Sequence, residues 1–256
     1  LSAAKFDQNY NSQYSYIAKV GYPMGMMYGF IYEGTYKYED FDKVGDTYTL
    51  KRNVPYFSSE SNTQPGMPKY ADLNGDGIID DNDRTMIGNG MPKHTGGFTN
   101  NFEYKGYDLS IFIQWSNGND ELKANRLFFE NSNKTRDLNQ YASYADRWTP
   151  ENPESNIPRA TDSGSNKVFS TRIIEDGSFL RLKTVSLGYT LPKQLTKKWK
   201  IDNARVFVAG QNLWTCTGYS GYDPEVSIRE GALTPGLDFS AYPRAYSISF
   251  GINLGF

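Results

Sequence analysis

The last eleven residues of the chain alternate strictly between two kinds of side chain. Tyr246, Ile248, Phe250, Ile252, Leu254 and Phe256 are apolar or aromatic, whereas the residues between them are serine, glycine or asparagine. This alternation indicates a β-strand whose two faces meet different surroundings. Its length matches the ~9–11 residues with which a tilted strand crosses a bilayer. We therefore expect a membrane-barrel strand; an ordinary sandwich strand with one wet face is the alternative.

The composition of the whole chain is compatible with such a barrel. Only 38% of the 256 residues are hydrophobic, the mean hydropathy is −0.64, and no apolar run is long enough for a transmembrane helix. Barrel strands place their apolar residues at alternate positions, so their average hydropathy is low. Aromatic residues make up 15% of the chain, as in the aromatic girdles of outer-membrane barrels. A glycan-binding sandwich is also rich in tyrosine and tryptophan.

Six further segments show strand patterns. They are found around Tyr14–Val20, Met24–Glu33, Gly96–Tyr104, Tyr107–Ser116, Ser178–Leu191 and Ala204–Trp214. The third and fourth predict a hairpin, because Lys105-Gly106 between them supplies the glycine that a tight turn needs. Face assignment is ambiguous at the start of Ser178–Leu191, where Leu180 and Leu182 lie on the opposite parity from Val185, and it is weak in Ala204–Trp214.

The connections between these segments alternate in length. Long irregular regions at Gly34–His94, Asn117–Asp176 and Thr215–Pro243 alternate with the short connections Lys105-Gly106 and Pro192–Asn203. Bacterial barrels have short periplasmic turns and long extracellular loops. We therefore expect a periplasmic C-terminus and extracellular long regions. Since closure takes about eight strands or more, we also expect a fragment whose partner strands, like any signal peptide, precede Leu1.

Residues 72–83 carry the strongest local motif, a calcium-binding type of loop. Its predicted ligands are Asp72, Asn74, Asp76, the carbonyl of Ile78, Asp80 and Asp83, at loop positions 1, 3, 5, 7, 9 and 12, with Gly77 at the sharp turn. This spacing wraps a short chain around one hard cation that takes six to eight oxygen ligands. Position 12 is aspartate instead of glutamate, which shortens its reach. A structural calcium ion is expected here; a solvated Asp/Gly turn is the alternative.

No pattern of catalytic residues stands out, and we expect no enzyme. His94, the only histidine, is expected at the surface, and Cys216 has no histidine partner and no second cysteine. The chain contains neither a Gly-x-Ser-x-Gly elbow nor a phosphate loop. Asp223-Pro-Glu225 is interpreted as a structured turn and not as a catalytic carboxylate pair. The net charge of −2 argues against a nucleic-acid partner.

An ordered set of short motifs resembles the SusC/RagA family of TonB-linked outer-membrane proteins. The motifs are Asp72-Leu-Asn-Gly-Asp-Gly-Ile-Ile-Asp80, Asp83-Arg84, Ile87-Gly-Asn89, Pro92-Lys93, Gly97-Phe98, Tyr104-Lys-Gly-Tyr-Asp-Leu109, Arg181-Leu-Lys183, Leu187-Gly-Tyr-Thr-Leu-Pro192, Gly210-Gln-Asn-Leu213, Thr217-Gly-Tyr-Ser-Gly-Tyr-Asp-Pro-Glu225, Tyr242-Pro-Arg244 and Leu254-Gly-Phe256. They run in order from about Gly21 to Phe256. Each motif is weak alone, and their order makes the resemblance specific.

The resemblance implies an all-β fold, with residues 1–256 forming the C-terminal antiparallel strands of a barrel of about 22 strands. It also implies import of oligosaccharides, or in some members peptides, across the outer membrane of Bacteroidetes-type bacteria. A SusD-like surface lipoprotein would cap the barrel, lipid would surround it, and TonB would act on a plug outside this chain.

The competing hypothesis is a secreted, calcium-stabilised β-sandwich that binds glycans as an adhesin. Under either hypothesis Trp148, Tyr219 and Tyr222 could stack on sugar rings, anchor a rim or pack within a loop, and the sequence leaves these three roles open. Uninterrupted apolar alternation ending on Phe256 favours the barrel over the sandwich.

Overall fold

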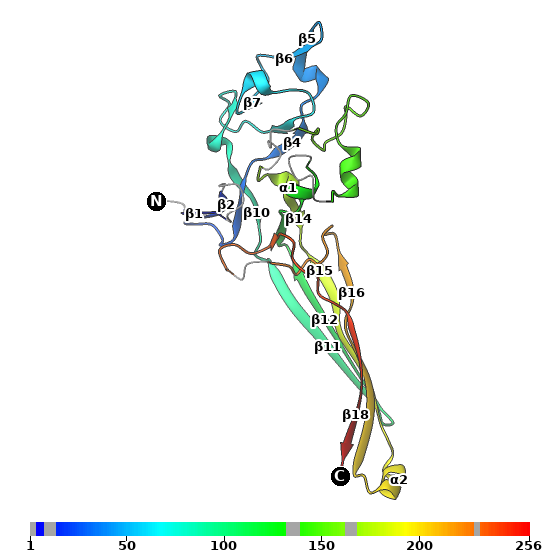
Figure 1. The fold of residues 1–256 in the computed structure, drawn as a ribbon. Coiled ribbons are helices and arrows are strands. Elements are labelled where there is room, and N and C mark those ends of the chain that lie inside the picture. The colour runs from blue at the N-terminus through cyan, green and yellow to red at the C-terminus, as the bar shows by residue number, and fades with distance from the viewer. Residues whose placement is uncertain (1–3, 8–13, 132–138, 162–167, 228–230) are drawn as a thin grey trace. The chain divides into compact units, whose positions relative to one another are not determined.

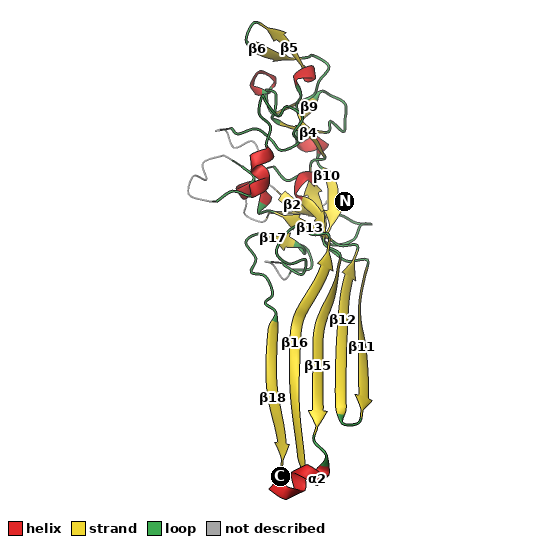
Figure 2. Cartoon of the chain, turned by 90° about the vertical axis from the view of Figure 1, so that its right-hand side faces the viewer, coloured by secondary structure: helices red, strands yellow, loops and turns green. Residues whose placement is uncertain are grey.

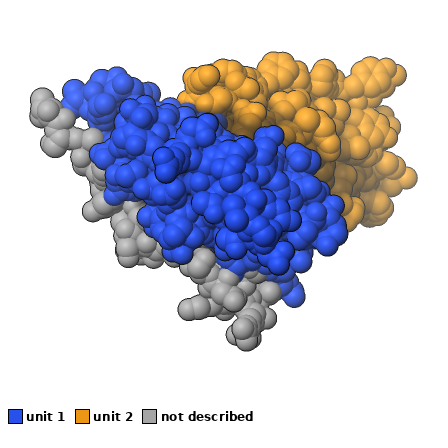
Figure 3. Space-filling view, turned by 90° about the horizontal axis from the view of Figure 1, so that it is seen from above, with its two compact units in different colours: residues 1–91, 120–175, 227–241 blue, residues 92–119, 176–226, 242–256 orange. Residues whose placement is uncertain are grey.

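The computed structural model describes residues 4–7, 14–131, 139–161, 168–227 and 231–256. Most regular elements in these ranges are β-strands, as Figure 2 shows, and the few helices are one or two turns long. None of the described helices is both long and apolar enough to cross a membrane. The chain divides into two compact units, coloured separately in Figure 3.

Unit 2 is built on a five-stranded antiparallel sheet of residues 92–119, 176–226 and 242–256 (Figures 1 and 2). The strands are, in spatial order, β11 (His94–Tyr104), β12 (Tyr107–Asn117), β15 (Phe179–Thr190), β16 (Asn203–Thr217) and β18 (Ser247–Gly255). Each of them contains or overlaps a predicted strand, so these predictions are confirmed. Between β15 and β16 lie the short helices α2 (Lys193–Thr196) and η6 (Lys197–Trp199).

The hairpin between β11 and β12 turns at the predicted residues. Lys105 has a φ of 48° and Gly106 a φ of 86°, so both central residues are left-handed. Two left-handed residues define the type I′ turn, whose twist suits a two-residue hairpin. Pairing then runs unbroken from Tyr104 opposite Tyr107 to His94 opposite Asn117.

The strand register separates the sheet into an apolar face and a polar face. One row across the five strands is Phe102, Leu109, Leu187, Val208 and Phe250; the neighbouring row on the other face is Asn101, Ser110, Ser186, Ala209 and Ser249. The apolar side chains are open to the surroundings: Phe250 is 82% exposed and Ile252 is 68% exposed. Large exposed apolar surfaces of this kind mark contact with another apolar phase.

A register shift in β15 explains why the sequence pattern at the start of this strand was ambiguous. β15 contains an extra residue at Lys183 relative to β12, where Phe112 and Ile113 pair with Thr184 and Leu182. Leu180 and Leu182 therefore share the apolar face with Val185, although their sequence parity differs. β16 also shifts its register between Gln211 and Trp214, which weakened its alternation.

Unit 1 consists of residues 1–91, 120–175 and 227–241. Its strands are β1 (Ala4–Asp7), β2 (Tyr14–Ala18), β3 (Met26–Gly29), β4 (Tyr32–Thr35), β5 (Phe41–Val44), β6 (Thr47–Leu50), β7 (Tyr56–Phe57), β8 (Pro68–Tyr70), β9 (Ile78–Ile79), β10 (Thr85–Asn89), β13 (Asp120–Lys123), β14 (Ile174–Asp176, its last residue in unit 2) and β17 (Leu237–Asp238). Its helices are α1 (Arg126–Phe129) and the short 3₁₀ helices η1 (Tyr38–Asp40), η2 (Glu60–Asn62), η3 (Asp81–Asp83), η4 (Ala142–Asp146) and η5 (Thr171–Ile173). The strand predicted around Tyr14–Val20 corresponds to β2.

The three long regions contribute to one core in unit 1 together with β2 and β3, the first region through the partly buried Ile87. A buried cluster combines residues far apart in sequence: Tyr16, Met27, Leu122, Ala124, Leu127, Phe169, Ile173 and Leu237. Polar contacts tie the same segments, since the Tyr16 hydroxyl donates to Pro235 O at 2.8 Å and Asn125 Nδ2 donates to Asp238 Oδ1 at 3.1 Å. The described residues of unit 1 therefore share a hydrophobic core drawn from distant segments.

The prediction of one strand over Met24–Glu33 is wrong. The segment is divided into β3, which pairs with β2 and β10, and β4, which pairs with β8, and neither strand belongs to the five-stranded sheet. The break occurs where the backbone NH of Phe30 bonds to Phe169 O at 2.9 Å and Phe30 forms an isolated bridge with Ser170. Contacts with a distant segment thus override the local alternation.

Gly29 allows this close approach, so we expect the substitution Gly29→Ala to destabilise unit 1. A Cβ at Gly29 would lie 2.3 Å from Phe169 O, a backbone atom that cannot rotate away. Overpacking of this type costs about 1–3 kcal/mol. Limited proteolysis of the whole protein should show faster cleavage in residues 120–175. Gly218→Ala is the control, because no atom lies within 4 Å of a Cβ there and Gly218 does not have a positive φ; equal resistance of G29A and G218A would contradict the prediction.

Candidate functional site

The polar face of the sheet carries an ion pair close to the β11–β12 turn. Arg205 on β16 donates from Nε to Asp108 Oδ1 at 2.9 Å and from Nη2 to Asp108 Oδ2 at 2.5 Å. β15 lies between these two strands, and Gly188 faces the pair: a Cβ there would lie 2.3 Å from Arg205 Nη2. The two-pronged arginine–carboxylate geometry ties three strands together across the polar face.

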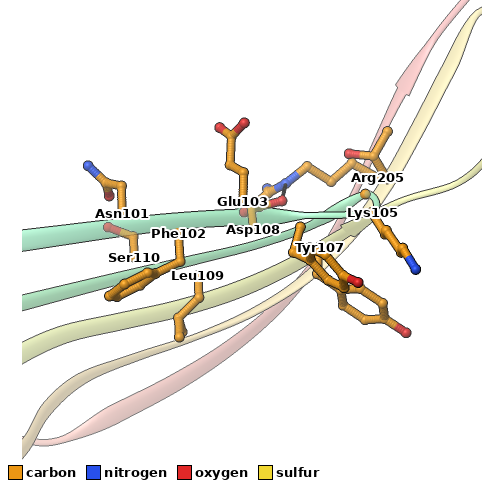
Figure 4. Close-up of a pocket in the computed structure, with 12 residues that line it drawn as sticks. Asn101, Phe102, Glu103, Lys105, Tyr107, Asp108, Leu109, Ser110 and Arg205 are labelled. Atoms are coloured by element: carbon orange, nitrogen blue, oxygen red, sulfur yellow. Dashed lines mark hydrogen bonds and ion pairs between the residues drawn. The ribbon is translucent and has the colours of Figure 1, made fainter.

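Figure 4 shows the side chains around this ion pair, which line a recess. Glu103 and Asp108 lie on one side of the hairpin, and Phe102 and Leu109 lie on the other. The recess is therefore bordered by charged side chains on the polar face and by aromatic and aliphatic side chains on the apolar face. This distribution matches the pattern expected for a barrel wall, polar inside and apolar outside.

A second, larger charged cluster lies at the opposite end of the sheet. Its centre is Arg181 on β15, whose side chain is 2% exposed. Arg181 donates from Nη2 to Asp223 Oδ1 at 2.5 Å, from Nη1 to Glu225 Oε2 at 3.0 Å and from Nε to Thr215 Oγ1 at 3.0 Å. All five N–H donors sit on one planar group, so three simultaneous contacts fix its orientation.

The two acceptors of Arg181 belong to the segment that follows β16. Glu225 also accepts a hydrogen bond from Lys183 Nζ at 3.3 Å and forms an ion pair with Arg244, whose Nη2 lies 3.3 Å from Oε1. Asp223 accepts from the backbone NH of Glu225 at 2.9 Å and of Arg244 at 3.2 Å. The cluster therefore attaches residues 217–226 and the start of residues 242–256 to the sheet.

Asp223 remains ionised in this setting. Burial raises the pKa of its carboxyl, but the hydrogen bond from Arg181 and the two backbone N–H groups outweigh burial, so the pKa lies below its ordinary value. In this structure the Asp223 carboxylate accepts hydrogen bonds from a guanidinium and from two backbone N–H groups. The interpretation of Asp223-Pro-Glu225 as a structured turn is confirmed.

The three aromatic residues singled out from the sequence have different environments. Trp148 is 4% exposed and packs against Tyr38 with a centroid distance of 5.6 Å, and Tyr219 is 5% exposed. Both therefore pack within the protein and offer no ring face to a sugar. Tyr222 is 80% exposed and is the one of the three that is open to a ligand.

The calcium-type loop is ordered by its own backbone. Asp72 accepts from the NH of Gly75 at 2.7 Å and of Gly77 at 2.8 Å, and Gly77 has the positive φ, 84°, that the sharp turn needs. Buried Asp83 accepts from the NH of Leu73 at 2.8 Å and of Asp80 at 2.8 Å, which joins the two ends of the loop. The predicted turn geometry is thus present.

The side chains in this loop are turned toward N–H groups. In the described ranges, no three carboxylate, imidazole or thiol groups converge where a metal ion could sit. The other predicted ligands are the amide of Asn74, which accepts from the NH of Asp76 at 2.9 Å, and the carbonyl of Ile78. Cation binding here would require Asp72 and Asp76 to exchange hydrogen bonds for metal contacts.

The remaining candidates for chemistry lie at the surface. His94 is exposed, and its Nδ1 accepts a hydrogen bond from Trp115 Nε1 at 3.3 Å. Cys216 is an exposed free thiol. The sequence missed the two charged clusters, although the local alternation assigns Asp108 to the polar face; the face of Arg181 was ambiguous. Their partners, Arg205, Asp223 and Glu225, are too distant in sequence for spacing to reveal them.

Comparison with known proteins gives relatives over most of the chain. No family model matches. TonB-dependent receptor P3 of Formosa agariphila is 33% identical over 247 residues, which cover 94% of this chain and 23% of the relative. TonB-dependent receptor P26 of the same organism is 37% identical over 198 residues, 75% of this chain and 20% of the relative. TonB-dependent receptor SusC of Bacteroides thetaiotaomicron is 25% identical, over 77% of this chain and 18% of the relative.

Solved structures share the fold. The RagAB peptide transporter aligns with a TM-score of 0.73 at 24% identity, over 100% of this chain and 24% of that chain. The RagAB peptide importer in the closed-closed state aligns with a TM-score of 0.69 at 26% identity, over 94% of this chain and 24% of that chain. The chain belongs to the SusC/RagA family of TonB-dependent outer-membrane proteins.

Membership of the SusC/RagA family confirms the all-β fold class and the resemblance found in the motifs. The five strands of unit 2 are an open sheet and represent one part of a family barrel. The chain spans roughly a quarter of the length of the family members that it matches. Activity, substrate and partners of the whole SusC/RagA-type protein therefore go beyond what this segment displays.

Proposed function

We propose that β11, β12, β15, β16 and β18 form the C-terminal part of the barrel wall of a transporter in the outer membrane. The observation that carries this proposal is the division of the sheet into two faces, with Phe250 and Ile252 exposed on the apolar side. The apolar face contacts lipid, and the polar face, with Asp108 and Arg205, lines the lumen. A secreted sandwich would cover such a face with a second sheet.

The two ends of the sheet then lie on opposite sides of the membrane. The ends joined by Lys105-Gly106 and by residues 191–202 face the periplasm, together with Phe256. The long regions at Gly34–His94, Asn117–Asp176 and Thr215–Pro243 lie outside the cell. This orientation follows from the general rule that barrel turns are short on the periplasmic side and long on the extracellular side.

The transporter imports oligosaccharides with energy supplied through TonB, and a SusD-like lipoprotein closes its extracellular opening. Membership of the SusC/RagA family supports transport over catalysis, and so does the sequence, in which no pattern of catalytic residues stands out. Peptide import is the second candidate, and it is favoured by the fold shared with the RagAB peptide transporter. The exposed ring of Tyr222 provides one stacking surface for either substrate.

Binding by the assembled complex tests this function and separates its two versions. The whole receptor and its lipoprotein partner should be purified together and titrated with a panel of oligosaccharides and a panel of peptides. We expect saturable binding of an oligosaccharide and loss of uptake in cells that lack TonB. Binding of peptides but not of oligosaccharides would show that the receptor imports peptides. Uptake that is unchanged without TonB would contradict the transport proposal.

We further propose that residues 72–83 bind a structural calcium ion through Asp72, Asn74, Asp76, Ile78 O, Asp80 and Asp83. The order of oxygen ligands and the turn at Gly77 support this site. A bound divalent cation would neutralise several carboxylates that otherwise repel one another in a short loop. Because the ion would bind only the folded loop, it would stabilise unit 1.

Calcium removal should loosen this loop. We expect the chelator EGTA to accelerate proteolysis near residues 72–83 in the whole receptor, and added Ca²⁺ to reverse the effect, because calcium binding favours the folded state by mass action. The double variant Asp72→Asn/Asp76→Asn should be cleaved rapidly with or without calcium. Asp42→Asn/Asp46→Asn, in the β5–β6 hairpin, is a charge-matched control. Cleavage rates that do not respond to Ca²⁺ would disprove the site.

A further inference from the structure

The connection between β15 and β16 carries a strong local charge. Residues 192–203 contain four lysines, Lys193, Lys197, Lys198 and Lys200, and one acidic residue, Asp202, in a chain whose net charge is −2. All four lysines are exposed. Leu195 and Trp199 lie among them and are 49% and 66% exposed. The connection is thus a basic surface with apolar side chains in its midst, and we name it the lysine turn.

The lysine turn is folded and not a loose loop. Thr196 is 1% exposed, and its carbonyl accepts from the NH of Ile201 at 3.2 Å. The NH of Leu191, just before the turn, donates to Ala204 O at 2.9 Å, and the NH of Asp202, near its end, donates to Gly255 O at 2.8 Å. The helices α2 and η6 therefore present the lysines from a fixed position at the end of the sheet, as Figure 2 shows for α2.

The charge of the lysine turn is not neutralised by the protein. Within the part of the chain that the structure describes, no ion pair joins any of its four lysines to a carboxylate. At the other end of the same sheet, Arg181, Lys183 and Arg244 all contact Asp223 or Glu225. Unpaired positive charge is thus concentrated at one end of the sheet.

Aromatic rings lie beside the lysine turn on the apolar face. Gly106 O accepts from the NH of Thr190 at 2.7 Å, which places the β11–β12 turn at the same end of the sheet. Tyr107 and Tyr189 pack there with a centroid distance of 4.5 Å. Rows of aromatic residues mark the membrane–water interface in barrels, and basic residues just beyond such a row reach the level of the lipid headgroups.

We propose that the lysine turn binds the phosphate headgroups of anionic phospholipids in the membrane leaflet at this end of the barrel. This inference rests on the proposed membrane location. Trp199 and Leu195 enter the interface, while the four lysines lie over the headgroups. Charge complementarity selects an anionic lipid over a zwitterionic one, and the fixed turn provides the binding surface without an ordering cost at the moment of contact.

The lipid composition bound to the whole receptor tests this proposal. The receptor is purified in micelles that contain equal amounts of phosphatidylglycerol and phosphatidylcholine, and bound lipids are counted by native mass spectrometry. We expect phosphatidylglycerol to predominate. In Lys193→Gln/Lys197→Gln/Lys198→Gln its binding should fall about tenfold or more, since each lysine contributes several-fold in affinity for an anionic surface.

The matched control removes three exposed lysines elsewhere, Lys19→Gln/Lys43→Gln/Lys93→Gln, and should bind phosphatidylglycerol as the unmodified receptor does. A second variant guards against misfolding. Lys200 has a φ of 58°, so Lys200→Gly removes a charge and relieves the backbone; it should fold well and still bind less phosphatidylglycerol.

Four other results would overturn the proposal. The first two are an equal loss of phosphatidylglycerol binding in both triple variants, and equal binding of phosphatidylglycerol and phosphatidylcholine by the unmodified receptor. The other two are binding of free inorganic phosphate as strong as that of phosphatidylglycerol, and lysine-dependent binding of purified peptidoglycan in place of lipid. A receptor that does not insert into micelles as a folded β-protein would instead refute the proposed membrane function, and it is recognised separately by its electrophoretic mobility without heating.

Discussion

Phe250→Arg should prevent stable assembly of the receptor in the outer membrane. Phe250 lies in the middle of β18, opposite Val208, and is 82% exposed on the apolar face. An exposed residue in water tolerates arginine with little effect. A residue facing lipid near the bilayer midplane does not, and the cost there is about 2–4 kcal/mol. Unfolding in urea from lipid vesicles should show this loss, together with less receptor in the outer-membrane fraction.

Ser249→Arg is the control for this substitution. Ser249 is the preceding residue and lies on the polar face, opposite Ala209. The same added charge should have a small effect on stability there, because that face meets water in the lumen. If F250R and S249R assemble equally well, the apolar face does not contact lipid.

Arg181→Met should release residues 217–226 from the sheet and destabilise unit 2 by about 3–5 kcal/mol, the usual cost of leaving a buried charge without its partner. The guanidinium is the direct counter-ion of Asp223 and contacts Glu225 as well. Methionine fills similar space but provides no donor. Denaturant unfolding of the whole receptor measures the stability, and proteolysis after Tyr219 and Tyr222 measures the release of the segment.

Two further variants show whether the effect arises from unpaired charge. Lys183→Met removes a half-buried cation that forms an ion pair with Glu225, so it should cost less than about 1 kcal/mol. Arg181→Met/Asp223→Leu removes both members of the buried pair and should recover part of the lost stability. An R181M receptor as stable and as protease-resistant as the unmodified one would show that the cluster does not hold this segment.

The sequence predicts the barrel sheet well because barrel strands need a simple pattern. Phe250 and Ser249 have different surroundings, and the same contrast between an apolar and a polar side chain recurs at every second position of the strand. The turn at Lys105-Gly106 was also predictable, because a type I′ turn requires the left-handed backbone conformation and glycine adopts this conformation readily. The strands with shifted register, β15 and β16, gave weaker patterns because an added residue reverses the parity.

Unit 1 was much less predictable, because its order comes from contacts between distant segments. Nothing near Phe30 in sequence indicates that its NH bonds to Phe169 O, and this contact divides the predicted strand. The same holds for Arg181 and Asp223, which are 42 residues apart. Local spacing did reveal the loop at Asp72, because its turn contacts join residues that are at most 10 positions apart in the sequence.

A spin-label scan of β18 tests the barrel wall most directly. Cys216 is first replaced by serine, and single cysteines at positions 247–255 of the whole receptor in lipid vesicles carry a nitroxide label. Collision rates with oxygen, which dissolves in lipid, and with a water-soluble nickel complex are measured at each position. The model of the barrel wall predicts oxygen maxima at 248, 250, 252 and 254 and nickel maxima at 247, 249, 251 and 253. Nickel access at all positions, or low access to both reagents at Phe250, would contradict it.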